Sequence, residues 1–174
     1  SVLVLYIHSL DTLPGGTQRR VWHLLKGVAA AGWDVNVLVP GPAYEVHERL
    51  GVRFWNYRAP SRTELQGRGL RGFSRQVYHD LVAPSMIRVA RHVIETESVS
   101  LVQAEHVWTA LPAARIAYRN GLPWIYDSHA VEVDIAETSS SEIYRSYVRF
   151  LEKRACRRAD LILISTKAYD TEVA

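Results

Sequence analysis

The sequence predicts an α/β fold, with a mostly parallel sheet covered by helices on both faces. Continuous apolar runs rich in β-branched residues, typical of strands buried on both sides, alternate with segments of helical periodicity. Such alternation implies right-handed crossovers between parallel strands. The chain has 174 residues, of which 48% are hydrophobic, so it can bury the core of one compact domain.

Each expected element in the first part of the chain follows from its residues. Residues 2–7 form an unbroken apolar run and are expected to be a strand. Apolar residues recur at helical spacing from residue 17 until Gly32 stops that helix. Two further apolar runs predict strands over residues 35–39 and 52–57.

The second part of the chain continues the alternation after two irregular segments. Residues 58–75 hold five arginines and three glycines, and residues 132–140 are polar, so both are expected to be loops. The remaining expected elements are helices over residues 74–97, 109–119 and 142–158, and strands over residues 99–104, 123–127 and 161–164.

Composition narrows the partners and the location of the protein. A net charge of +3 is mild and does not call for nucleic acid. The one cysteine, Cys156, rules out an internal disulfide and fits a reducing, cytoplasmic location. No apolar run approaches the roughly 18 residues that a membrane span needs. The chain stops just after a strand, which suggests a trimmed domain whose second half is missing.

The arginine-rich stretch over residues 58–75 has two interpretations. Leu65, Leu70 and Phe73 are interleaved with its arginines, so the stretch could lie on an anionic membrane face. A solvated loop is the simpler interpretation and the one we favour. Binding to acidic lipid is therefore a hypothesis of peripheral membrane contact.

A glycine pair follows the first expected strand. Gly15 and Gly16 stand where this strand hands over to a helix, so backbone N–H groups there could hold a phosphate or a carboxylate. A tight turn explains the same residues about equally well. The loop is not G-x-G-x-x-G, and no Gly-Lys-Ser/Thr follows it, so a nicotinamide dehydrogenase and a P-loop NTPase are both disfavoured.

Histidines follow two expected strands at the edge where ligands bind in such sheets. His129 comes after the strand over 123–127, and His106 comes after the strand over 99–104. Either could bind a sugar hydroxyl or stabilise a developing charge, although a single histidine is more often structural. These histidines could also ligate a metal, as in a metal-dependent hydrolase, together with His8, Asp11, Glu105 and Asp127. The spacing of this set fits no zinc pattern.

Three motifs resemble the N-terminal half of family-4 glycosyltransferases of the GT-B fold, which include phosphatidylinositol mannosyltransferases and sucrose-synthase-like enzymes. The first is Pro14-Gly15-Gly16-Thr17-Gln18 with the Gly32-Trp33-Asp34-Val35 turn, where Trp33 replaces the usual histidine. The second is Tyr126-Asp127-Ser128-His129. The third combines Glu152 with Ala159-Asp160-Leu161-Ile162 and Ser165.

The resemblance implies that residues 1–174 are the Rossmann-like, acceptor-side domain of such an enzyme, inactive without the donor-binding C-terminal domain. It implies retaining transfer from a nucleotide-sugar, without a further cofactor or metal. Gly15 and Gly16 would touch the donor phosphate, and His129 would be the catalytic contact to the donor sugar. The acceptor, a glycan, lipid or small molecule, would meet Gln18, with Asp11 and His106 beside it. The alternative is a non-catalytic α/β module that binds a phosphorylated or sugar ligand.

Overall fold

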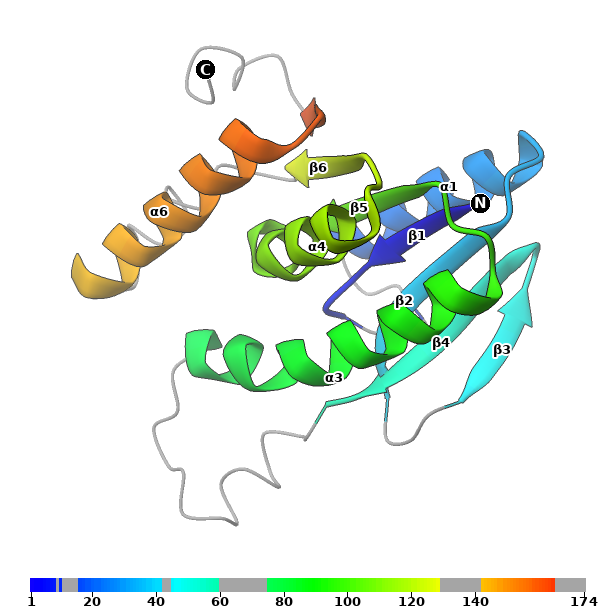
Figure 1. The fold of residues 1–174 in the computed structure, drawn as a ribbon, viewed down its shortest axis with the longest axis horizontal. Coiled ribbons are helices and arrows are strands. Elements are labelled where there is room, and N and C mark those ends of the chain that lie inside the picture. The colour runs from blue at the N-terminus through cyan, green and yellow to red at the C-terminus, as the bar shows by residue number, and fades with distance from the viewer. Residues whose placement is uncertain (9, 11–15, 42–44, 60–74, 129–141, 165–174) are drawn as a thin grey trace.

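The fold is known from a computed structural model, which describes residues 1–174 except 9, 11–15, 42–44, 60–74, 129–141 and 165–174. Strands and helices alternate along these residues (Figure 1). In chain order the elements are β1 (Val2–Leu5), α1 (Gly16–Ala30), β2 (Val35–Gly41), β3 (Val46–Arg49), β4 (Val52–Arg58), α3 (Arg75–Thr96), β5 (Leu101–Glu105), α4 (Val107–Asn120), β6 (Trp124–Ser128), α6 (Glu142–Arg158) and β7 (Leu161–Ile164).

Within the described residues, seven strands form one sheet with β1 at its centre. The strand order is β3-β4-β2-β1-β5-β6-β7. Every neighbouring pair is parallel except β3 with β4. Val2 of β1 lies opposite Val35 of β2 on one side and Leu101 of β5 on the other. All four residues of β1 are buried, as its apolar run predicts for a strand covered on both faces.

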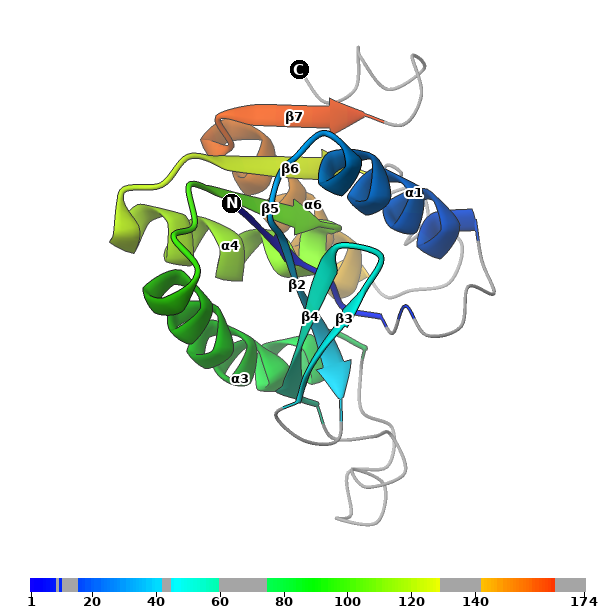
Figure 2. The same cartoon turned by 90° about the vertical axis from the view of Figure 1, so that its right-hand side faces the viewer.

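Helices cover both faces of the sheet, as expected (Figures 1 and 2). On one face α1 packs on β2 and β4, and on the other α3 packs on β1, β2 and β4. Beside α3, α4 packs on β5 and β6 and α6 packs on α4. Each face has its own buried cluster, with Val21 and Phe54 in the α1 layer and Met86 and Ile116 in the opposite layer. The predicted α/β architecture is confirmed.

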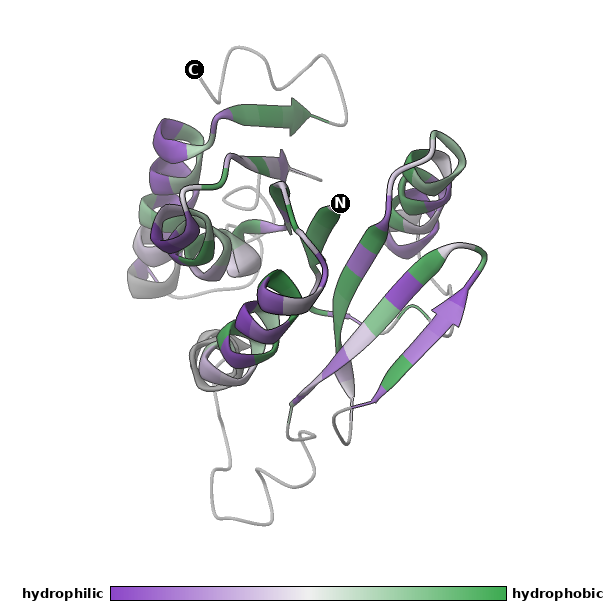
Figure 3. Cartoon of the chain, turned by 45° about the vertical axis from the view of Figure 1, so that its right-hand side comes forward, coloured by the Kyte–Doolittle hydropathy of each residue, from purple (hydrophilic) through white to green (hydrophobic). Residues whose placement is uncertain are grey.

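The strand β3 was not expected from the sequence. It forms an antiparallel hairpin with β4, and all four of its residues are exposed. Figure 3 shows β3 as mostly hydrophilic beside the apolar inner strands. An edge strand that buries neither face leaves no apolar pattern, which is why periodicity missed it.

Several element boundaries also differ from the expected ones. β1 ends at Leu5 rather than at residue 7, and β5 begins at Leu101 rather than at residue 99. β2 continues through Pro40 to Gly41. Pro40 has no backbone N–H to donate, but β1 has already ended beside it, so the sheet loses no hydrogen bond there. α4 begins at Val107, two residues earlier than periodicity indicated. It ends where Gly121 adopts a left-handed conformation with φ of 62°, as the Asn120-Gly121 pair predicted.

Asp160, one residue of the third motif, fastens β7 to β6. Its carboxylate accepts a hydrogen bond from the backbone N–H of Trp124 at 2.9 Å, and its own N–H donates to the carbonyl of Trp124 at 3.0 Å. The indole of Trp124 donates to the carbonyl of Arg158 at 2.8 Å. This motif residue therefore has a structural role.

Candidate functional site

The carboxyl ends of β1, β5 and β6 bring together most of the buried polar side chains of the sheet. β5 ends at Glu105, β6 ends at Ser128, and His8 lies just beyond β1. The helices α1 and α4 begin at the same edge (Figure 2). Ligands of open parallel sheets bind beyond this edge, so it is the place to look for chemistry.

His106, between β5 and α4, has a strained backbone. Its φ of 76° and ψ of 155° lie in a region that is essentially restricted to glycine. A non-glycine residue there costs about 1–3 kcal/mol, and such outliers gather at functional sites. The His106 N–H donates to the carbonyl of Asp127 at 3.3 Å, and the His106 carbonyl accepts from the N–H of Thr109 at 3.2 Å. The strained turn is thus tied both to β6 and to the first turn of α4.

The side chain of His106 lies in a cluster of three rings. It stacks with Tyr6 at 6.5 Å between centroids and meets His8 edge to face at 5.9 Å. Tyr6 also meets His8 edge to face at 5.5 Å. The hydroxyl of Tyr6 is buried and has no hydrogen-bond partner among the described residues. Burial, helped by the charge of Glu105, raises the pKa of Tyr6, so this hydroxyl stays protonated.

Glu105 lies at the base of the ring cluster and is fully buried. Burial raises the pKa of its carboxyl to about 7, although the hydrogen bond from Gln103 and the charges of His106 and Arg20 lower it. The Gln103 amide donates to this carboxyl at 2.5 Å. Gln103 and Glu105 are two residues apart on β5, so they lie on the same face of the sheet. A buried carboxyl that titrates near neutrality can hold or release a proton at this edge.

An ion pair connects the first helix to the sheet at this edge. Arg20 of α1 bonds the fully buried carboxylate of Asp127 in β6 at 2.8 Å. The guanidinium is about one-third exposed, with 35% of the side chain accessible. Because a buried carboxylate needs a partner, this pair fixes the second turn of α1 beside β6.

The structure describes three of the six site residues that the sequence nominated. Gly16 is the exposed first residue of α1, and a Cβ built there would meet no atom of the described residues within 4 Å. Gln18 is half-buried in the same helical turn. His106 lies in the ring cluster described above. The other three, Asp11, Gly15 and His129, lie outside the described residues, as does most of the arginine-rich stretch.

Sequence reasoning missed Tyr6, Arg20 and Thr109. Arg20 could have been found, because it follows Gly16 by one turn on a helix that begins at the ligand-binding edge. Tyr6 could have been found as the polar tip at the end of an apolar strand. Nothing in the sequence indicated Thr109, whose hydroxyl lies 2.8 Å from the carbonyl oxygen of Glu105.

The described residues also bear on metal binding and membrane insertion. They contain no group of three or more His, Cys, Asp or Glu side chains placed to hold a metal ion. None of the helices in the described ranges combines the length and the hydropathy that crossing a bilayer requires.

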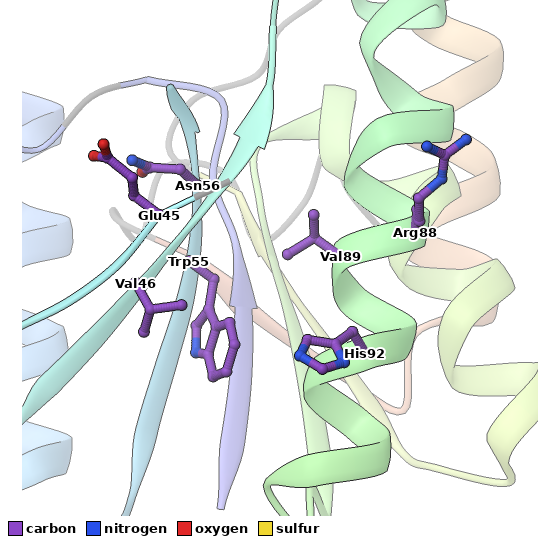
Figure 4. Close-up of a pocket in the computed structure, with 7 residues that line it drawn as sticks. All are labelled: Glu45, Val46, Trp55, Asn56, Arg88, Val89 and His92. Atoms are coloured by element: carbon purple, nitrogen blue, oxygen red, sulfur yellow. The ribbon is translucent and has the colours of Figure 1, made fainter. Parts of the chain in front are cut away.

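A separate cavity of about 410 Å³ lies between the β3–β4 hairpin and α3 (Figure 4). Val89 and His92 of α3 face Trp55 of β4 across it, whereas the side chains of Glu45 and Asn56 point away from α3. None of the residues of the ring cluster lines this cavity. Its lining includes neither the strained residue nor the buried charged residues of the strand edge, so it is a weaker candidate for chemistry.

Comparison with protein families gives one match. Residues 15–174 match the profile of the glycosyl transferase 4-like domain. No curated protein sequence matches the chain significantly.

Comparison with solved structures shows the same fold in glycosyltransferases. Sucrose-phosphate synthase from Thermosynechococcus elongatus aligns with a TM-score of 0.78 at 16% identity, over 98% of this chain and 44% of that one. Os79 from O. sativa, solved in complex with UDP, aligns with a TM-score of 0.63 at 10% identity, over 95% and 46%. SsfS6, a glycosyltransferase from Streptomyces sp. SF2575, aligns with a TM-score of 0.54 at 18% identity, over 90% and 45%. The chain thus spans less than half the length of these three structures and has the Rossmann-like fold of one half of a GT-B enzyme.

Proposed function

Because the chain belongs to the glycosyl transferase 4-like family, we propose that residues 1–174 are the N-terminal, acceptor-side domain of a retaining glycosyltransferase. The reaction moves a sugar from a nucleotide-sugar to an acceptor. A second, donor-binding domain completes the active site, and a chain spanning less than half of its solved neighbours is consistent with this division. The more specific resemblance to phosphatidylinositol mannosyltransferases remains a prediction from the sequence alone.

The observation that carries the proposal is the arrangement at the carboxyl edge of the sheet. There the strained His106, the buried Glu105 and the Arg20–Asp127 pair meet beside the start of α1. Reactive sites, unlike ordinary protein surface, combine such features in one place: a strained backbone, a carboxyl group with a shifted pKa, and a cation held in a fixed position. This edge is also where the fold binds ligands.

The donor phosphates are assigned to the start of α1. Loss of a nucleotide diphosphate builds negative charge on oxygen, and the free N–H groups of a helix start stabilise that charge without reorganising. Gly16 leaves open space there, so a phosphate can approach the backbone closely. Gly15 shares this role, and UDP in the Os79 complex supports a nucleoside diphosphate as the leaving group.

The remaining roles follow the family resemblance. His129 contacts the donor sugar as the catalytic residue, and Gln18, Asp11 and His106 face the acceptor, a glycan, lipid or small molecule. No cofactor or metal takes part. We expect the enzyme to work in the cytoplasm. Residues 58–75 are expected to be a solvated loop, and contact with acidic lipid through this stretch is the alternative. Closure of the two domains excludes water, which would otherwise hydrolyse the donor.

Turnover by the full-length protein tests the reaction. The protein is incubated with UDP-, GDP- and ADP-sugars and candidate acceptors, nucleotide release is measured, and NMR of the product reports the anomeric configuration. Transfer with retention supports the proposal, whereas inversion removes the retaining mechanism. Calorimetry that shows tight sugar or phosphate binding without turnover supports a non-catalytic binding module instead.

Two variants test the residue assignments in the same assay. Gly16→Val should weaken donor binding, and since a Cβ at this position meets no atom within 4 Å in the part of the chain that the structure describes, the loss reports on the ligand. Gly27→Val on the same helix, where a Cβ also meets no atom within 4 Å, is the matched control. His129→Ala should lower transfer strongly, and unchanged turnover in this variant removes the catalytic role.

A further inference from the structure

The strained conformation of His106 needs an energetic cause, because the chain would otherwise relax. His106 does not have the freedom of glycine, yet it adopts a backbone conformation that is nearly exclusive to glycine. Such a conformation persists only where surrounding contacts over-determine it. The contacts that hold the backbone on both sides of His106 are therefore the place to look.

Thr109 holds this turn from the α4 side. Its side chain is fully buried, and its hydroxyl lies 2.8 Å from the carbonyl oxygen of Glu105 and 3.0 Å from that of His106. Thr109 lies in the first turn of α4, where backbone N–H groups have no partner four residues earlier within the helix. Its N–H bonds the carbonyl of His106 at 3.2 Å. The hydroxyl adds a contact to the carbonyl of Glu105, the residue just before the strained position.

We propose that Thr109 is a positioning residue, whose hydroxyl holds the Glu105–His106 turn so that the His106 ring keeps its contacts with His8 and Tyr6 at the reactive edge. Without the hydroxyl, the Glu105 carbonyl loses this donor and the turn relaxes toward ordinary dihedral angles. The Cα–Cβ direction of His106 then rotates, and its ring leaves the stacked and edge-on contacts. The consequence for catalysis rests on the proposed sugar transfer, but the consequence for the ring does not.

Thr96 of α3 offers a matched comparison. Its hydroxyl bonds the carbonyls of His92 at 3.0 Å and Val93 at 3.4 Å, which are the same four-back and three-back positions. Those bonds lie within a helix of regular backbone, at an exposed position. Removing this hydroxyl therefore deletes the same kind of bond at two carbonyls whose residues have no positive φ.

The test compares Thr109→Val, Thr109→Ser and Thr96→Val in the full-length protein. Imidazole NMR signals of His106, assigned from a His106→Gln variant, report the ring position, and steady-state kinetics report kcat and KM. Thr109→Val should shift the His106 signals and lower kcat on the order of tenfold or more, since small misplacements at a reacting centre are costly. Thr109→Ser, which keeps the hydroxyl, should restore both, and Thr96→Val should change neither.

Several outcomes overturn the proposal. Unshifted His106 signals in Thr109→Val exclude a positioning role, and so do equal losses in Thr109→Val and Thr109→Ser, which would indicate packing alone. If Thr109→Val does not fold, adding His106→Gly should rescue folding, since glycine needs no clamp, and failure of this rescue also overturns the idea. No turnover by the unaltered protein would refute sugar transfer, while the His106 signals would still decide the role of Thr109.

Discussion

Substituting His106 by glycine and by alanine measures the strain in the turn before α4. Both changes delete the imidazole, so the lost ring contacts cancel in the comparison. At the observed φ of 76°, alanine keeps a strain of about 1–3 kcal/mol that glycine avoids. Glycine gives back about 0.4–1 kcal/mol through the greater entropy of its unfolded chain. The glycine variant should therefore be more stable by about 1.3 kcal/mol at the centres of these ranges and by about 2.6 kcal/mol at most, which is roughly 3–10 °C in Tm for a domain of this size.

The assay is thermal and urea unfolding of both variants under the same conditions. Ala114→Gly supplies the control, because Ala114 lies in the regular interior of α4 and glycine there should cost about 1 kcal/mol. The sign of the glycine effect should therefore reverse between the two positions. An alanine variant at position 106 that matches or exceeds the glycine variant in stability would show that the backbone is not strained there.

Three further changes can be checked by unfolding measurements. Burial raises the pKa of Glu105 from 4.5 to about 7 in the folded protein. As pH rises, the unfolded chain therefore loses this proton before the folded protein does. The free energy of unfolding should consequently fall by about 3 kcal/mol between pH 4.5 and pH 7. Glu105→Gln should flatten that decline in urea titrations from pH 4 to 8, and a decline of the same size in the variant would count against the assignment. Gly41→Ala should cost about 1–3 kcal/mol, because its Cβ would lie 2.6 Å from the side chain of Asn56, and an unchanged Tm would contradict that close approach. Gly27→Ala, in open space on α1, should instead gain about 0.5–1 kcal/mol, and a loss of stability would contradict the helical environment described for it.

The parallel core was predictable because burial on both faces leaves a mark in the sequence. The strand β1, which is buried along its whole length, is an unbroken apolar run, and the helix α6 has the bounds that its periodicity indicated. The hairpin strand β3 was not predictable, since its pairing with β4 depends on backbone bonds rather than on buried side chains.

The candidate site was predictable in place but not in geometry. Topology alone puts His106 and the start of α1 at the carboxyl edge of the sheet, and the structure confirms both positions. The strain at His106 and the Arg20–Asp127 bond depend on contacts between segments far apart in the chain. No local pattern encodes such contacts. The roles given to Gly15, Asp11 and His129 remain predictions.

The central place of β1 has a consequence for how the protein is made. One edge of β1 forms its backbone hydrogen bonds with β2, which is synthesised soon afterwards. The other edge stays unpaired until Leu101 and the rest of β5 have been synthesised. Pairing across so long a stretch of chain is slow, and an open strand edge invites association with other chains. A nascent polypeptide interrupted between β4 and β5 would therefore expose its most apolar strand, so ribosome stalling in that interval should promote aggregation.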